Sequence, residues 1–320
     1  MRVIPNEASA AADSRPLAAI KSQPEDWRVH EYLGRPLAGH GEHRYLYLEK
    51  RNLNTMAVAA ELIKRYGVRP QDIGYAGLKD KHGITRQWFS ITTPNDSIDE
   101  DLRSPVLGAS GEYITCLHAT RHTHKLRRGS HVRNDFVINL RGDIPRLVET
   151  VGQLAEPFAN YFGPQRFGGN NLAAARRWLI ERKPRRVTGS RRSLYLSVAR
   201  SHLFNLILAE RERQGLWRCC MPGDALDEPA GSLWGRGRSP FSDRALAIEN
   251  AAVVDEQALC HGLEMAGVSR GLRLLGVTPS NFSFAQPQGE AILEISFGLP
   301  PGAYATVMLQ RNFELKDQSR

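Results

Sequence analysis

A carboxylate surrounded by basic side chains stands in a polar turn of the sequence. This residue is Asp80, and its basic neighbours are Lys79, Lys81, His82 and, shortly after, Arg86. Nearby cations favour the ionised form of a carboxylate and can also hold a phosphate close to it. A carboxylate that stays charged in this way suits nucleophilic attack on a nucleoside. An Asp in a turn also commonly hydrogen-bonds its own backbone, so residue type and spacing alone leave both interpretations open.

Basic residues outnumber acidic residues, and their distribution indicates a polyanionic partner. The 320-residue chain has a formal net charge of +9, which favours polyanions through steering and counterion release. Segment 121–133 contains five Lys or Arg residues, three His residues and no acid. Segment 176–192 has one acid, Glu181, against Arg176, Arg177, Arg182, Lys183, Arg185, Arg186, Arg191 and Arg192. Charge runs usually lie on solvated faces, but two such clusters exceed what solubility requires, so we expect nucleic acid as the partner.

Several other classes of protein are excluded by the sequence. No run of eighteen apolar residues is present, so we expect no transmembrane helix, and the first twelve residues do not resemble a signal peptide. The four cysteines show no CxxC spacing, and His122 and His124 have no further ligand at a usual metal-binding distance in sequence. We therefore expect reduced thiols, no metal site and a cytoplasmic location.

Hydrophobic alternation predicts an α+β first part of the chain. Strands are expected at 27–33, 43–48, 84–92, 112–119 and 135–140, with a short apolar piece at 73–78. A helix is expected from the N-cap Asn54 to Tyr66, with Gly67 ending it, and another at 144–155. The elements show no regular alternation of strand and helix, so a doubly wound parallel sheet is not expected.

The composition changes after Tyr161. Long amphipathic helices are predicted from Ser193 to Arg213 and over 255–266, with a strand at 291–299. The segment 221–242 is rich in Gly and Pro and is predicted to be irregular, including 231–235, which only loosely imitates a GxSxG motif. This order predicts a first domain, an inserted second domain and a return to the first.

The segment 76–88 resembles the AGxKDxxGxTxQW signature of the TruD family of pseudouridine synthases, whose Asp is the nucleophile. Every fixed position of the signature is present. Other segments resemble family motifs in the right order: PEDWRVHE at 24–31, KLRRG at 125–129, NDF at 134–136, NYFGPQRFG at 160–168 and LPPGAYAT at 299–306. The resemblance extends from about Lys21 to Leu315.

The resemblance implies roles for individual residues. Asp80 aligns with the nucleophile, and Asn134 with a residue near the target nucleotide, where its amide can donate and accept hydrogen bonds. Trp27 and Tyr304 stand where the family usually has Phe, and Phe136 is implied near the same pocket. We expect these rings to contact the flipped base, with core packing as the alternative. Contacts to the RNA backbone are expected from Lys21, Lys79, Lys81, His82, Arg86, Lys125, Arg127, Arg128 and Arg166.

The implied function is conversion of uridine 13 in the D arm of tRNA to pseudouridine, without cofactor or metal. The implied fold is a catalytic domain at 1–159 and 279–320, with a mixed, mainly antiparallel sheet, and an inserted α/β TRUD domain at 160–278 that is shorter than usual. Two alternatives remain: an inactive RNA-binding protein of the same fold, and the same chemistry on another RNA. The point of attack, uracil C6 or ribose C1′, is left open. A monomer is expected, since no exposed heptad pattern stands out.

Overall fold

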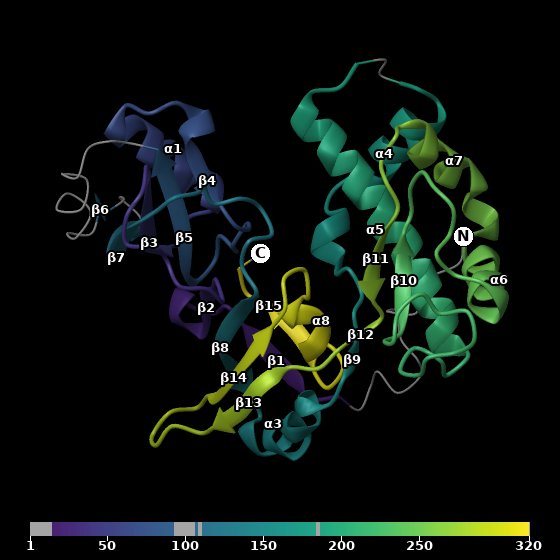
Figure 1. Cartoon of the computed structure of the whole chain (residues 1–320). Coiled ribbons are helices and arrows are strands. Elements are labelled where there is room, and N and C mark those ends of the chain that lie inside the picture. Colours follow the sequence, from purple (N-terminus) through teal and green to yellow (C-terminus); the bar gives the residue numbers. More distant parts are fainter. Residues whose placement is uncertain (1–14, 93–105, 108–110, 184–185, 320) are drawn as a thin grey trace. The chain divides into compact units, whose positions relative to one another are not determined.

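The computed structural model describes residues 15–92, 106–107, 111–183 and 186–319, which divide into two compact units (Figure 1). We call them the sheet unit, made of Pro16–Ala155, Pro279–Pro301 and Asn312–Arg320, and the helical unit, made of Glu156–Thr278 and Gly302–Arg311. This division by contacts groups Gly302–Arg311 with the helical unit. The assignment of a catalytic and an inserted domain to these units is a prediction.

The sheet unit is built on a mixed sheet that joins eleven strands of the described residues. Its main path is β13-β14-β8-β2-β5-β3-β7-β6, while β1 pairs with β8 and β15, and β4 pairs with β5. The strands are β1 Leu17–Ile20, β2 Trp27–Tyr32, β3 His43–Arg51, β4 Ile73–Tyr75, β5 Ile84–Thr92, β6 Val106–Leu107, β7 Tyr113–His122, β8 Arg133–Gly142, β13 Ser280–Ala285, β14 Leu293–Leu299 and β15 Glu314–Asp317. The pairs β2–β5 and β1–β15 are parallel and the other pairs antiparallel. This confirms the predicted mixed, mainly antiparallel sheet.

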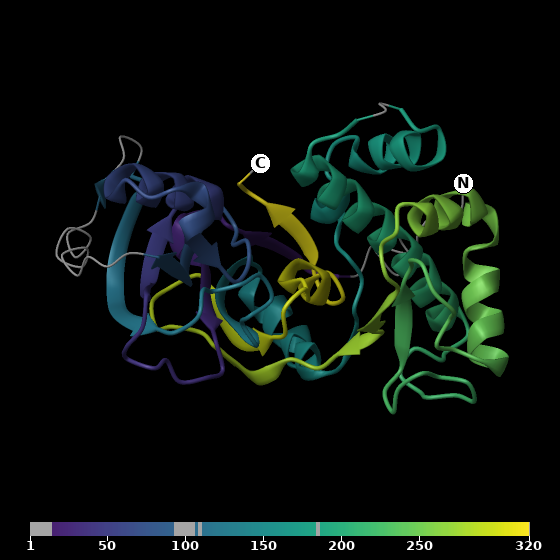
Figure 2. The ribbon, with the colours of Figure 1, turned by 45° about the horizontal axis from the view of Figure 1, so that its top comes forward.

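Helix α1, Thr55–Tyr66, covers one face of this sheet, and Figures 1 and 2 both show it beside β3, β4 and β5. The Asn54 side chain accepts a hydrogen bond from the backbone N–H of Ala57 at 2.8 Å, and Gly67 ends the helix in the left-handed region. The helix buries Val58 and Leu62 against the core of the sheet. The predicted helix is confirmed at both ends.

Strand alternation decides which polar groups enter the core below α1. Along β3, Leu46, Leu48 and Lys50 all point to the covered face and are fully buried. Glu31 holds the corresponding position at the end of β2, after Trp27 and Val29. Charged side chains therefore lie on the apolar face of the sheet, where each requires a partner.

The helical unit contains five helices among its described residues, of which α5 is the longest. They are α4 Asn171–Ile180, α5 Gly189–Arg213, α6 Asp243–Ala252, α7 Gln257–Met265 and α8 Ala305–Leu309. Two short antiparallel pairs accompany them: β9 Phe158–Ala159 with β12 Gly276–Val277, and β10 Ala230–Leu233 with β11 Gly271–Leu274. Leu203 of α5, Leu179 of α4 and Leu263 of α7 share its core. None of the described helices is long and apolar enough to cross a membrane.

Two sequence predictions in the helical unit were wrong. Helix α5 begins at Gly189 rather than after Ser193, because the Thr188 hydroxyl already caps the N–H of Arg191 at 3.4 Å. The segment 221–242 was expected to be irregular, but it contains β10. Composition could not show this strand, because its partner lies some forty residues away and Gly231 serves to bring the strand close to Phe204 of α5.

The N-cap of α1 gives a test of the fold. Replacing Asn54 by Ala removes the acceptor for the Ala57 N–H, and we expect the free energy of unfolding to fall by about 1 kcal/mol. Urea unfolding followed by circular dichroism measures the change. Asn54→Asp keeps an acceptor and serves as the matched control. Equal losses in the two variants would contradict the capping role.

Candidate active site

The turn that carries Asp80 joins β4 to β5, and the buried side chain of Lys50 hydrogen-bonds its backbone. The Lys50 ammonium donates to the backbone carbonyl of Asp80 at 2.7 Å and to that of Leu53. The backbone N–H of Asn52 also donates to the Gly83 carbonyl at 3.1 Å. Lys50 and Asn52 therefore fix the backbone of the turn at Asp80 and at Gly83.

The ammonium group of Lys50 is buried in the core of the sheet unit, where charged groups are rare. Its side chain is 0% exposed, and burial lowers its pKa to about 8, while nearby Asp80 favours the charged form and Lys79 opposes it. Retaining a buried ammonium requires hydrogen-bond acceptors, and the two carbonyls provide them. Lys50 thus places a positive charge directly behind the Asp80 turn.

The Asp80 carboxylate itself is held by an aromatic residue. The indole N–H of Trp27 donates to Asp80 Oδ2 at 2.9 Å. The Trp27 ring is only 2% exposed, lies below the Lys21 ammonium at 4.4 Å from the ring centroid, and meets the edge of Phe136. Of the aromatic residues expected at the pocket, Trp27 contacts Asp80 and Phe136 packs against Trp27.

A buried ion pair lies beside Asp80. Lys79 contacts Glu31 Oε2 at 2.7 Å and donates to Asn134 Oδ1 at 2.7 Å. Glu31 also accepts the backbone N–H of Trp88 at 3.1 Å. Burial raises the pKa of Glu31, and the charge of Lys79 and its hydrogen bond act against that rise. Lys79 is thus already paired with a carboxylate, and it orients the Asn134 amide rather than offering a free cation.

Two polar side chains hold the start of the turn. The Thr55 hydroxyl accepts the backbone N–H of Lys79 at 2.9 Å and donates to Gln87 Oε1 at 2.8 Å. Gln87 in turn donates to the Gly77 carbonyl at 3.2 Å. These bonds connect the start of α1 and the middle of β5 to the segment before Asp80.

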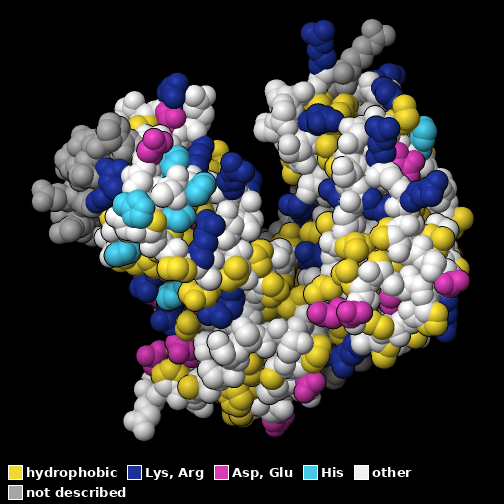
Figure 3. Space-filling model, in the orientation of Figure 1, with side chains coloured by type: hydrophobic (Ala, Val, Ile, Leu, Met, Phe, Trp, Pro, Cys, Tyr) yellow, Lys and Arg dark blue, Asp and Glu magenta, His cyan; other side chains and the backbone are white. Residues whose placement is uncertain are grey.

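Exposed cations lie on the same unit as this site. Lys81 and His82 follow Asp80 in the exposed part of the turn, and Arg127 and Arg128 are exposed in the loop after β7. Arg128 lies over the ring of Tyr75 at 4.9 Å and donates to its hydroxyl at 2.6 Å. Figure 3 shows Lys, Arg and His side chains gathered on one face of this unit.

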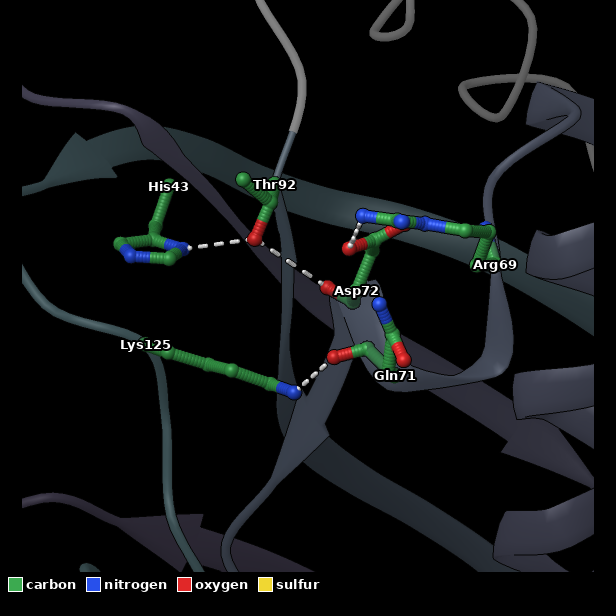
Figure 4. A network of polar contacts seen from close by, with 6 residues as sticks. All are labelled: His43, Arg69, Gln71, Asp72, Thr92 and Lys125. Atoms are coloured by element: carbon green, nitrogen blue, oxygen red, sulfur yellow. Dashed lines mark hydrogen bonds and ion pairs between the residues drawn. The ribbon is translucent and has the colours of Figure 1, made fainter.

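Lys125 belongs to a polar network in this region. Figure 4 shows its ammonium donating to the backbone carbonyl of Gln71, close to the Asp72–Arg69 ion pair. The Thr92 hydroxyl contacts His43 Nδ1 at 3.0 Å on the other side of the same network. Lys125 therefore ties its loop to the turn before β4.

The remaining predicted residues are placed differently. Arg86 alternates with Thr85 and Gln87 on β5, so it points to the opposite face of the sheet, where it pairs with Glu49 at 2.6 Å. Lys21 pairs with Asp317 at 3.6 Å as well as lying over Trp27.

Tyr304 and Arg166 belong to the helical unit. Tyr304 packs edge-on against Phe162 at 6.2 Å between ring centroids. Arg166 contacts the hydroxyls of Ser197 and Ser201 on α5. Among the arginine-rich residues of 176–192, Arg185 lies outside the described residues, whereas Arg191 and Arg192 are exposed on the first turn of α5.

Sequence reasoning missed three side chains that build the site: Lys50, Glu31 as the partner of Lys79, and Thr55. Lys50 and Glu31 carried a signal that could have been used. Glu31 is a charged residue at a core-facing position of the predicted strand 27–33, and Lys50 continues the alternation of Leu46 and Leu48 two residues beyond the predicted strand 43–48. A charged residue at such a position needs a buried partner. Thr55 gave no such signal, because the first turn of a helix commonly carries Thr.

Comparison with known proteins places these residues in a family. The sequence profile described as "TruD: tRNA pseudouridine synthase D (TruD)" matches residues 13–186. The tRNA pseudouridine synthase D of Cellvibrio japonicus is 42% identical, covering 94% of this chain and 90% of that protein. The corresponding protein of Methylococcus capsulatus is 39% identical over 93% of this chain and 92% of its own length.

A solved structure supports the fold. The putative tRNA pseudouridine synthase D (TruD) of Methanosarcina mazei has a TM-score of 0.62 to this chain, covering 94% of each. Its sequence identity of 18% is low, so this likeness supports the arrangement of elements alone.

His131 gives a pH-dependent test of the site. It is 7% exposed, and its Nε2 lies 3.4 Å from the amide nitrogen of Asn134. Burial, and then the charge of Lys79, lower its pKa from 6.5 to about 4. The unfolded chain therefore binds more protons than the folded chain between pH 4 and 6.5, so the stability contributed by neutral His131 is present above pH 6.5 and is lost as the pH falls towards 4.

We expect His131→Gln to reduce this acid sensitivity by roughly 2 kcal/mol across that range. Urea unfolding at pH 4.5, 5.5 and 6.5 measures it, and exposed His261→Gln controls for the loss of an imidazole. An unchanged slope in His131→Gln would show that His131 is not held neutral in the folded protein.

Proposed function

Because the chain belongs to the TruD family of tRNA pseudouridine synthases, we propose that it converts uridine 13 in the D arm of tRNA to pseudouridine, with Asp80 as the nucleophile. The protein is accordingly an isomerase. The observation that carries the proposal is the placement of Asp80: its carboxylate accepts a hydrogen bond from Trp27, and its backbone is fixed by the Lys50 ammonium. A nucleophile held at two points suits attack in a defined direction.

The reaction rearranges bonds without an outside donor. The bond between ribose C1′ and uracil N1 breaks, the base turns, and a bond from C1′ to C5 forms. The proton on C5 leaves to solvent, and N1 takes up a proton, so atoms and electrons balance within the nucleoside and water. No group is transferred from a second substrate, and the family resemblance implies neither cofactor nor metal. Attack by Asp80 on C6 and attack on C1′ both satisfy this balance.

The uridine must leave the base stack before Asp80 can reach it. Extrusion costs a few kcal/mol, which aromatic and phosphate contacts must offset. On the sheet unit, Trp27 and Phe136 supply a rigid aromatic wall, and Asn134 supplies an amide already oriented by Lys79. We assign to Asn134 the recognition of the uracil edge, and the aromatic contact that the family resemblance implies for Tyr304 stays a prediction.

Phosphate contacts fall to the exposed cations. Lys81, His82, Arg127 and Arg128 are exposed on the sheet unit and are proposed to bind the RNA backbone. Lys125 is proposed to bind it as well, from the same loop. Lys79 also lies at the site, but its pairing with Glu31 favours an orienting role over a phosphate contact.

The two units are proposed to divide the work. The sheet unit, which carries Asp80, would be the catalytic domain, and the helical unit would be the inserted TRUD domain. Arg191 and Arg192, exposed at the start of α5, would bind RNA phosphates from the helical unit. A monomer acting on tRNA in the cytoplasm fits this assignment.

Asp80→Asn tests the proposed chemistry. Asparagine is nearly the same size but is a poor nucleophile, and we expect the release of tritium from tRNA labelled at uridine C5 to fall at least a thousandfold, or roughly 4 kcal/mol in the barrier. Asp135→Asn changes a carboxylate that pairs with Arg133 on the other face of the sheet and serves as the control. Release by Asp80→Asn at the wild-type rate would remove Asp80 from the mechanism.

Changing the RNA separates the proposed substrate from the alternatives. A transcript with cytidine at position 13 should release no tritium if that position is the target. Release from this transcript, or only from another RNA, would favour the same chemistry on a different substrate. Tight binding of tRNA with no release by the wild type would favour an RNA-binding protein that has lost catalysis.

Arg127→Glu tests the RNA-binding assignment. We expect the Kd for tRNA to rise roughly fivefold at moderate salt, and the dependence of log Kd on log salt to weaken by about one, because a phosphate contact is lost. The single-turnover rate at saturating protein should not change. Lys64→Glu makes a charge reversal of the same sign at an exposed position of α1 and should have a smaller effect on Kd. Equal effects of the two variants would indicate a general charge effect instead of a contact at Arg127.

A further inference from the structure

Trp27 contributes more to the site than an aromatic face. Its indole N–H is directed at the carboxylate of Asp80, 2.9 Å from Oδ2. A hydrogen bond to an ionised acceptor is stronger and more directional than one between neutral groups. A phenylalanine ring at this position could supply the same apolar wall but has no such donor.

The Trp27 ring cannot move away from this contact easily. It is the first residue of β2, where its backbone pairs with Ile138 of β8. The Lys21 ammonium lies over the ring, and Phe136 packs against it at 6.2 Å with an interplanar angle of 75°. A buried ring fixed on several sides makes a rigid hydrogen-bond donor.

The Asp80 turn, for its part, fits closely against Trp27. Gly83 has a φ of +139°, and a Cβ atom at this position would lie 2.4 Å from the carbonyl oxygen of Trp27 and 3.2 Å from the ring atom Cδ1. Any side chain at position 83 would therefore push the turn away from β2. The absence of a side chain allows the approach that brings Oδ2 within reach of the indole.

The remaining carboxylate oxygen is left available. Among the described residues, Asp80 Oδ1 has no hydrogen-bond donor, whereas Oδ2 is held by Trp27 and the backbone carbonyl by Lys50. The hydrogen bond from Lys50 fixes the position of the Asp80 backbone, and the hydrogen bond from Trp27 fixes the rotation of its carboxylate. They leave one defined oxygen to approach the nucleoside.

From these contacts we propose that Trp27 is a positioning residue, whose indole N–H holds Asp80 Oδ2 so that Oδ1 faces the substrate. The proposal rests on the proposed function for the identity of the reaction, but the hydrogen bond can be tested without it. Aromatic packing against the base could occur at the same time, and it would not require the N–H.

Trp27→Phe is the direct test, since it keeps an aromatic ring and removes the N–H. We expect the single-turnover rate of pseudouridine formation at saturating protein to fall roughly tenfold, the loss of one charge-assisted hydrogen bond. The Kd for tRNA should stay within about twofold. Phe136→Leu removes an aromatic ring that packs against Trp27 but leaves the hydrogen bond to Asp80 in place. Thermal unfolding of both variants measures the stability that each loses through poorer packing.

A spectroscopic measurement keeps the proposal testable if Trp27→Phe is poorly folded. The chain has five tryptophans, so a nitrogen-15 correlation spectrum should contain five indole N–H resonances, and Trp27→Tyr identifies the one that belongs to Trp27. In Asp80→Ala this resonance should move upfield and its proton should exchange faster with water, because the acceptor is gone. Asp135→Asn should leave it in place.

The outcomes separate this proposal from the function on which it rests. An indole resonance that responds to Asp80→Ala, together with a lower rate and unchanged Kd in Trp27→Phe, supports the positioning role. A wild-type rate in folded Trp27→Phe, a loss confined to Kd, or an indole resonance indifferent to Asp80→Ala would overturn it. Absence of any pseudouridine formation by the wild type would instead contradict the proposed function, and the resonance would still decide whether the hydrogen bond exists.

Discussion

The buried ammonium of Lys50 is the contact on which the rest of the site depends. It follows the buried Leu46 and Leu48 on the inward face of β3, and it connects the carbonyls of Leu53 and Asp80. Burying a charge is costly, and the lowering of its pKa to about 8 reflects that cost. The hydrogen bonds and the nearby Asp80 offset it. The strand end, the start of α1 and the Asp80 turn are consequently held together by one group.

A similar arrangement repeats around this centre. Lys79 and Glu31 form a buried pair that orients Asn134, and Thr55 with Gln87 holds the backbone before the turn. Buried charges thus fix the geometry, while exposed cations such as Arg127 remain available for phosphate. Salt is expected to weaken the exposed contacts much more than the buried pair. Under the proposed function, affinity for RNA would therefore depend on different residues from those that fix the shape of the site.

Local signals in the sequence were sufficient for much of the fold. The capping residues Asn54 and Gly67 predicted the bounds of α1, and the β-branched and aromatic residues of 84–92 predicted β5. Pairing over long sequence distances was not visible, so β10 was missed within a Gly- and Pro-rich segment. The Asp80 turn was found from its motif. Sequence could not show that Lys79 is buried beside Glu31 or that Trp27 donates to Asp80, because both depend on packing between strands.

The proposed chemistry requires a uridine to reach the free oxygen of Asp80 on the sheet unit. A crystal structure of Asp80→Asn bound to tRNA tests it most directly, through the distance between the unbonded amide atom of residue 80 and the nearest of C6 and C1′ of the flipped nucleotide. We expect about 3–3.5 Å, a near-attack distance, with uridine 13 in the site and the Trp27 indole N–H still donating to the amide oxygen. A bound tRNA whose nucleotides all stay stacked and distant from residue 80 would contradict it.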